Sequence, residues 1–169
     1  MKQYIVALSI IFALCQISCS DSSKADASIW LDPWVSCTPT ANPITKYGNS
    51  HWIHYDFGSV RTLSKSWIWN TNDPQKLNQG FKKVSIDYSE DGETWTHYGE
   101  MNFPKAEGKA VYGGFAGPDL VGVKARYMLL TALSNHGDPA CSGITEVKFN
   151  LLPIEPAKEN EGPKRYPEL

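Results

Sequence analysis

The sequence predicts an all-β protein built as an antiparallel β-sandwich. Apolar side chains recur with a period of two, as in half-buried strands. The joins between these segments are short and rich in Gly, Pro and Asn. No segment shows the apolar period of an amphipathic helix.

The first expected strand covers residues 51–57. Ile53, Tyr55 and Phe57 lie there on one face, and the side chains between them are polar. Residues 63–70 alternate in a similar way and are expected to form the next strand.

A hairpin is expected between strands at 81–89 and 94–101. Asp91-Gly92 supplies its turn, because glycine adopts a positive φ at low cost. Residues 125–133 are apolar on both faces, which predicts a central strand. Residues 144–151 form the last expected strand.

The order of the strands predicts where the connections lie. If successive strands run antiparallel, alternate connections fall at opposite ends of the sandwich. The connections at one end are longer and richer in Asn, Tyr, His and Lys than those at the other. Because binding residues concentrate on loops held by a rigid scaffold, this end is the candidate site. The connections are 38–50, 70–80, 102–110 and 134–143 at that end, and 58–62, 90–93 and 117–124 at the other.

The amino terminus predicts export. Lys2, an apolar run too short to span a bilayer and a small residue before Cys19 are typical of a signal peptide over residues 1–18. Cleavage before Cys19 would give a lipoprotein, anchored in a periplasmic or cell-surface membrane and followed by a linker over 19–29. Ordinary cleavage nearby is the alternative, because Gln16 stands where such signals usually have Leu.

The folded unit is expected to cover residues 30–152, followed by a Pro-rich polar tail over 153–169. The full chain has a formal net charge of −2 and no run of Lys and Arg, which argues against nucleic acid as a partner. Removal of 1–18 and modification of Cys19 would leave Cys37 and Cys141 as an even pair. In an oxidising compartment we expect them to be bridged, the alternative being two buried thiols.

Catalytic motifs are absent from the sequence. His51 and His54 project to opposite faces of a strand, so they cannot clamp one zinc ion. The sequence has no G-x-S-x-G, no Cys-x-x-Cys and no phosphate-binding glycine loop. We therefore expect a binding protein and not an enzyme.

Three segments resemble the discoidin (coagulation-factor type C) family. They stand in the expected order, and the resemblance implies a jelly-roll, galactose-binding-like sandwich. Among exported bacterial proteins it implies carbohydrate-binding modules, and a disulfide between the terminal strands. The segments are Gly48–Gly58 (GNSHWIHYDFG), Val84–Trp95 (VSIDYSEDGETW) and Ala125–Thr131 (ARYMLLT) followed by Gly143–Val147 (GITEV).

The resemblance also implies a structural calcium ion. Glu146 matches a ligand in the last strand, and Asn49 could help. Thr45, Tyr47 and Ser50 replace the carboxylates and other ligands usual in the loop before Trp52, and calcium takes about six to eight oxygen ligands. The alternative for Glu146 is a carboxylate that hydrogen-bonds loop amides.

Polar and aromatic side chains at the candidate end predict a sugar-binding site, because hydroxyls need fixed donors and acceptors and a sugar ring stacks on an aromatic face. The alternatives are ordinary turn residues, a Tyr packed within its loop and an exposed His. Relatives tend to have Trp-Gly where this chain has His136-Gly137, which puts a stacking platform there in doubt. The candidates are Tyr47, Asn49, Asn70, Asn72, Asp73 and His136.

Two neighbouring features are expected to be structural. Trp67 and Trp69 share one face of a strand, and we expect them to pack in the core, the alternative being a part in the sugar-binding site. Gly113 and Gly114 are expected to mark a bulge, the alternative being a close approach of backbone to a ligand.

Two functions follow. The first is a non-catalytic carbohydrate-binding module on an exported lipoprotein, with a glycan or polysaccharide as its partner. The alternative is a protein-interaction or assembly module of the cell envelope, in which the same loop end meets a partner protein and the tail docks.

Overall fold

The computed structural model describes residues 33–154 of the chain. The predicted signal peptide, Cys19, the linker and residues 155–169 of the tail lie outside this range. No helix in the described range is long and apolar enough to cross a membrane. The elements are β1 (Trp34–Ser36), β2 (Thr40–Ala41), η3 (Thr45–Tyr47), β3 (Asn49–Asn70), η4 (Leu77–Gln79), β4 (Phe81–Ser89), β5 (Thr96–Asn102), β6 (Phe115–Asp119), β7 (Lys124–Asn135) and β8 (Ser142–Leu151).

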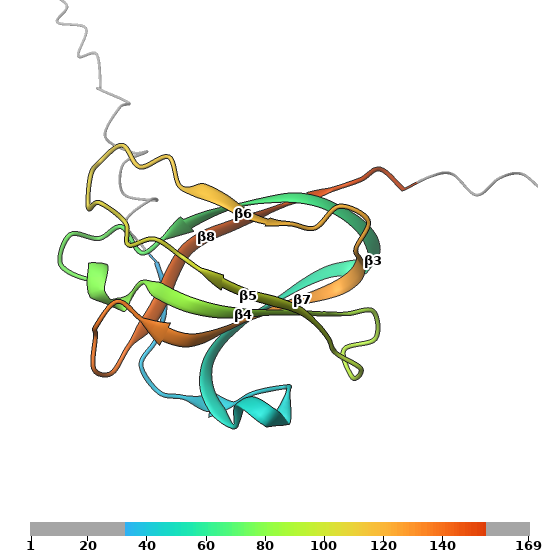
Figure 1. Ribbon diagram of the computed structural model, residues 1–169, viewed down its shortest axis with the longest axis horizontal. Coiled ribbons are helices and arrows are strands. Elements are labelled where there is room, and N and C mark those ends of the chain that lie inside the picture. The colour runs from blue at the N-terminus through green and yellow to red at the C-terminus, as the bar shows by residue number, and fades with distance from the viewer. Residues whose placement is uncertain (1–32, 155–169) are drawn as a thin grey trace, which may run out of the picture.

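The strands form an antiparallel sandwich whose two layers share β3, which confirms the predicted fold class (Figure 1). The first part of β3 pairs with β7, which pairs with β4 and then β5. The second part of β3 pairs with β6 on one side and β8 on the other, and β1 extends this layer beside β8.

Residues 58–62 lie within β3, so the expectation of a separate connection there was wrong. The pairing of β3 with β7 is interrupted between Asp56 and Arg61, where the strand passes from one layer to the other. Gly58 lies in this interval with φ of 78° and donates its N–H to the Asp56 carboxylate. A strand that changes sheets commonly does so through such an irregularity.

The hairpin and the central strand are confirmed. β4 pairs with β5 around the turn that contains Gly92, whose φ is 85°. β7 lies between β3 and β4, which makes it a central strand. Met128 and Leu130 pack in the core on one face, and Leu129 on the other face is buried as well.

The core fills the space between the layers. Ile53, Tyr55 and Phe57 pack against it, as their alternation predicted. Burial of these apolar faces supplies the main driving force for the fold. The fully buried core side chains include Leu63, Ile68, Phe81, Val84, Ile86, Leu120, Met128, Leu130 and Ile144.

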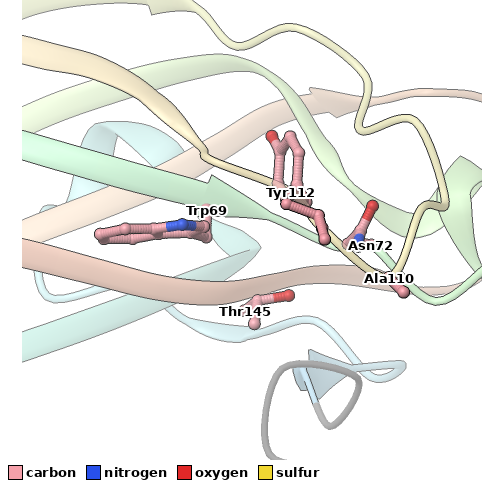
Figure 2. Close-up of a pocket in the computed structure, with 6 residues that line it drawn as sticks. Trp69, Asn72, Ala110, Tyr112 and Thr145 are labelled. Carbon is pink, nitrogen blue, oxygen red and sulfur yellow. The ribbon is translucent and has the colours of Figure 1, made fainter. Parts of the chain in front are cut away.

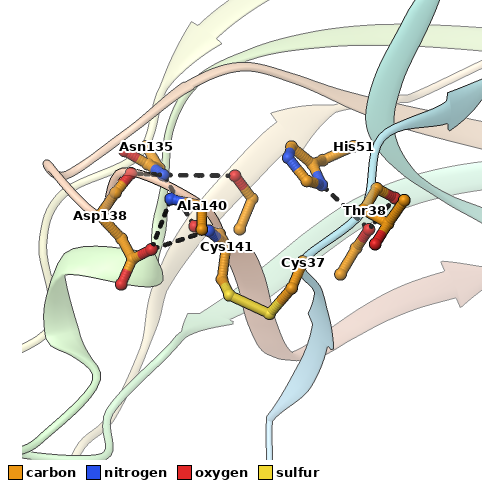
Figure 3. Close-up of a disulfide and its surroundings, with 9 residues drawn as sticks. Cys37, Thr38, His51, Asn135, Asp138, Ala140 and Cys141 are labelled. Atoms are coloured by element: carbon orange, nitrogen blue, oxygen red, sulfur yellow. Dashed lines mark hydrogen bonds between the residues drawn. A yellow bond between two sulfur atoms is a disulfide. The ribbon is translucent and has the colours of Figure 1, made fainter.

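A disulfide between Cys37 and Cys141 joins the segment after β1 to the segment before β8, as predicted (Figure 3). The Asp138 carboxylate accepts hydrogen bonds from the backbone N–H groups of Ala140 and Cys141. The bridge therefore ties the amino-terminal strand to a turn that has its own hydrogen bonds.

Candidate functional site

Three of the four connections predicted at one end of the sandwich meet there. The His136 backbone N–H donates to the Gly80 carbonyl at 3.1 Å, and the Asn70 side-chain amide donates to the Pro104 carbonyl at 2.9 Å. This part of the prediction is confirmed. We call residues 70–80, 102–110 and 134–143 the rim loops.

The 117–124 connection, predicted at the other end, lies against β3. The Leu63 N–H donates to the Val123 carbonyl, and the Leu120 N–H donates to the Ser64 carbonyl. These bonds join the 117–124 connection to β3 where the strand changes layers.

The fourth predicted connection, 38–50, leaves the rim and crosses the outer face of β4 and β7. Asn42 donates to the Thr131 hydroxyl at 2.9 Å, and the Tyr47 hydroxyl contacts Ser85 and Asp87 of β4. Ser85, Asp87 and Thr131 are buried polar residues on that face, and residues 38–50 supply their hydrogen-bond partners. The expectation that 38–50 contributes to the rim was wrong.

A pocket of about 220 Å³ opens between the end of β3, the start of β8 and the second rim loop (Figure 2). It is smaller than the roughly 300–1,000 Å³ of pockets for drug-sized ligands, so it suits a single small ring. Its lining residues are Trp69, Asn72, Ala110, Val111, Tyr112 and Thr145.

Trp67 and Trp69 lie on the outer face of the sheet, so the expectation that they pack in the core was wrong. Ile68 and Ser66 are buried in their place. Trp69 pairs with the exposed Glu146, and Trp67 with the exposed Lys148. The sequence shows that alternate side chains share a face, but it does not show which of the two faces packs against the other layer.

Gly113 and Gly114 precede β6, and the expected bulge does not lie at these residues. The register irregularity of β6 lies between Ala116 and Asp119. Gly114 has φ of 69°, and a Cβ atom there would lie 3.0 Å from the Trp69 ring and 2.5 Å from the Ile68 carbonyl. The close backbone approach is therefore to the chain's own tryptophan face.

Asn70 is fully buried. Its amide nitrogen donates to the carbonyls of Phe81 and Pro104 at 2.8 and 2.9 Å, and its oxygen accepts the Thr71 N–H. Because both amide N–H groups are used and the side chain is fully buried, the candidate role of Asn70 in sugar contact is corrected to one of holding the rim loops.

Asn72 lines the pocket but uses both ends of its amide within the protein. It donates to the Lys109 carbonyl at 2.7 Å and accepts the Gly108 N–H at 2.8 Å. Asn72 thereby fixes the backbone that carries Val111 and Tyr112.

Asp73 is an ordinary turn residue, which was the alternative to a sugar contact. Its carboxylate accepts the Gln75 N–H and pairs with Lys76 at 3.1 Å. These two contacts, the Gln75 N–H first, lower the pKa of Asp73.

Tyr47 and Asn49 lie apart from the pocket. Tyr47 packs its loop onto β4, which matches the alternative of a tyrosine that packs a loop instead of contacting a ligand. Asn49 is exposed at the start of β3, where it pairs with Ala41.

His136 lies in the third rim loop, half-buried. Its Nε2 atom is 3.1 Å from the Phe103 carbonyl, so this nitrogen carries a proton and donates. Burial is the main cause that lowers the pKa of His136, and the ring therefore favours its neutral form.

The pocket residues that sequence reasoning missed come mainly from residues 110–112, at the end of the second rim loop and just beyond it. Val111 is 91% exposed at the pocket, and burial raises the pKa of Tyr112. Thr145 donates to the Asn70 carbonyl at the opposite wall. The sequence signal that could have indicated these pocket residues is Val111 beside Tyr112, directly before two glycines.

The predicted calcium ligands come from different strand pairs. Asn49 pairs with Ala41, whereas Glu146 pairs with Trp69. Residues 33–154 contain no group of three or more His, Cys, Asp or Glu side chains placed to hold a metal ion. Two oxygen donors are fewer than the six to eight of a calcium site, and calcium binding stays a prediction from the sequence.

The pocket can hold a ligand that has both an apolar and a hydroxyl-bearing side. The Trp69 indole and the Tyr112 ring offer flat apolar surfaces from two elements (Figure 2). The Tyr112 and Thr145 hydroxyls lie beside them as polar groups.

Comparison with protein families gives one match. The model described as the F5/8 type C domain matches residues 20–147. No curated protein matches this chain.

Solved structures share the fold. CBM32-3 from a family 31 glycoside hydrolase of Clostridium perfringens matches with 17% identity and a TM-score of 0.52, over 72% of this chain and 76% of that chain. CpGH89CBM32-5 of the same organism, in complex with GalNAc-β-1,3-galactose, matches with 16% identity and a TM-score of 0.50, over 70% and 75%. The chain spans 65% of a GH31 CBM32-2 structure and 19% of a matched glycoside hydrolase.

Proposed function

The chain belongs to the F5/8 type C domain family, and from this we propose that it is a non-catalytic carbohydrate-binding module. The ligand is a glycan, and it binds in the pocket at the rim loops. The fold neighbours with the highest TM-scores among those above are carbohydrate-binding modules, one of them in complex with a disaccharide.

One observation carries the proposal. Trp69 presents its ring in a pocket together with Tyr112, beside the Thr145 hydroxyl. An indole stacks on the C–H face of a sugar ring while hydroxyls orient its polar edge. A pocket of about 220 Å³ suits one terminal ring of a glycan.

A glycan array with the purified protein tests this function, with GalNAc and GalNAc-β-1,3-galactose among the probes. We expect binding that Trp69→Ala weakens by about 10- to 100-fold, because the stacking surface is lost. Trp34→Ala removes another exposed indole outside the pocket and should leave binding unchanged. Silence of the wild-type protein on the array would argue against the proposal, as would equal binding by the Trp69 variant.

We further propose that the module is exported and anchored through an acylated Cys19, in the periplasm or at the cell surface. The short apolar run before Cys19 and the polar segment after it support this. The mass of the mature protein tests the anchor, since acyl chains add to it only if Cys19 is the new amino terminus. A protein of the cell envelope stays the alternative partner predicted from the sequence.

A further inference from the structure

We propose that the binding site continues from the pocket onto the outer face of β3 and β8, where Trp67 stacks a second ring of a glycan chain. This inference rests on the proposed function and names the ligand class: an oligosaccharide chain and not an isolated monosaccharide.

The two indoles form a track that bends between them. Trp67 and Trp69 are two residues apart in β3, so both point outward from the same face. Their ring centroids are 6.5 Å apart and their planes are inclined at 59°, so each ring faces a ligand at its own angle. This separation is on the scale of the repeat along a sugar chain. The pocket has room for one ring, so a chain whose end sits over Trp69 next meets Trp67.

The surface beyond Trp67 is hollowed. A second depression of about 410 Å³ lies on the same face, and Trp67, Lys65, Pro118 and Asn150 are among its lining residues. Trp67 is 42% exposed, so much of its ring is available for contact. The depression therefore lengthens the track away from the rim.

The Trp67 ring is held in place before any ligand arrives. Its Nε1 donates to the Gly113 carbonyl at 2.6 Å, and Gly114 lies against the same edge of the indole. A platform that is already ordered loses little conformational entropy on binding, which favours affinity.

Polar side chains flank the track. Lys148 is the strand partner of Trp67 and Glu146 that of Trp69, so they stand on the same face. With Lys65 and Asn150, they form no side-chain hydrogen bond or ion pair with residues 33–154. Their donors and acceptors are free to meet sugar hydroxyls on either side of the indoles.

Calorimetry with a chain-length series tests the inference. The probes are the methyl glycoside, disaccharide and tetrasaccharide of the glycan that responds most strongly on the array. We expect the tetrasaccharide to bind wild-type protein about tenfold more tightly than the methyl glycoside, through one added aromatic contact. Trp67→Ala should lose this gain and keep the monosaccharide affinity, whereas Trp69→Ala should lose both.

Further measurements guard against a misfolded variant. Trp67→Phe keeps a ring without the Nε1 donor and should retain part of the gain, and Val60→Ala on the exposed opposite end should retain all of it. In the NMR spectrum of the wild-type protein, the Trp67 indole N–H resonance should shift with the disaccharide and not with the methyl glycoside.

The outcomes separate the two proposals. Binding that Trp69→Ala abolishes, but that does not depend on chain length or on Trp67, overturns this inference and leaves the proposed function standing. Absence of binding at every chain length overturns both.

Discussion

At the scale of single residues, the side chains at the rim divide into amides that hold the loops and rings that line the pocket. The side-chain amides of Asn70 and Asn72 hydrogen-bond to backbone groups through both the nitrogen and the oxygen. Trp69 and Tyr112 supply the ligand-facing surface. Buried polar groups of this kind hold loops in one arrangement because leaving a partner unpaired is costly.

Replacement of Asn70 tests this structural role. Asn70→Ala leaves the buried Phe81 carbonyl and the part-buried Pro104 carbonyl without their donor, so we expect a loss of about 2–3 kcal/mol in the free energy of unfolding. Urea denaturation measures it. Asp73→Ala, which removes an exposed turn contact, is the matched control and should cost well under half as much. A stable Asn70 variant that fails to bind glycan would instead indicate a ligand contact.

At the scale of elements, β3 decides where the site lies. Its first part belongs to one layer and its second part to the other, and this change of layer brings Asn70 back to the rim where β3 begins. Hence the end of β3, the start of β8 and the rim loops meet at one place.

The turn of the β4–β5 hairpin holds a carboxylate whose pKa is lowered by hydrogen bonds. Hydrogen bonds to the Asp91 carboxylate, first from the Thr94 N–H and then from the Glu93 N–H and the Ser89 hydroxyl, hold the pKa of Asp91 well below its usual value of 3.8. A lowered pKa in the folded state contributes stability above the unfolded pKa that is lost as the pH falls through and below it.

We therefore expect the melting temperature of the wild-type protein to fall as the pH drops below about 4, by an amount that Asp91→Asn reduces, since an amide accepts the same bonds without titrating. Calorimetric scans across this range measure it. Glu90→Gln, in the same turn, is the control. Equal pH dependence of the wild-type protein and the Asp91 variant would contradict this role.

At the scale of the whole molecule, the Cys37–Cys141 bridge joins residues 104 positions apart in sequence. It links β1, at the edge of one layer, to the loop that carries His136. Because the loop closed by the bridge is long, the denatured chain loses considerable entropy.

Removal of the bridge should destabilise the whole sandwich. For Cys37→Ser combined with Cys141→Ser we expect the free energy of unfolding to fall by about 2–5 kcal/mol. Guanidinium denaturation of the oxidised wild-type protein and the double variant measures it, and reduction of the wild-type protein should reproduce the effect. No change on reduction would show that the native contacts alone hold β1.

The sequence by itself determined the layer architecture, the hairpin and the paired cysteines. Alternating side chains and an Asp-Gly turn are local signals, and each acts through the backbone geometry of a few residues. The cysteine pair was predicted differently, from the even number of cysteines left in an oxidising compartment. The same alternation ordered the strands well enough to gather three rim loops at one end.

Only the tertiary structure decided which side chains face a ligand. Alternation assigns Trp67 and Trp69 to one face, but the packing of the other layer determines that this face is the outer one. Likewise, Asn70 is buried because distant loops close over it, and Tyr47 leaves the rim because Ser85 and Asp87 on β4 bind its hydroxyl. These outcomes depend on contacts between residues far apart in sequence, which no local pattern encodes.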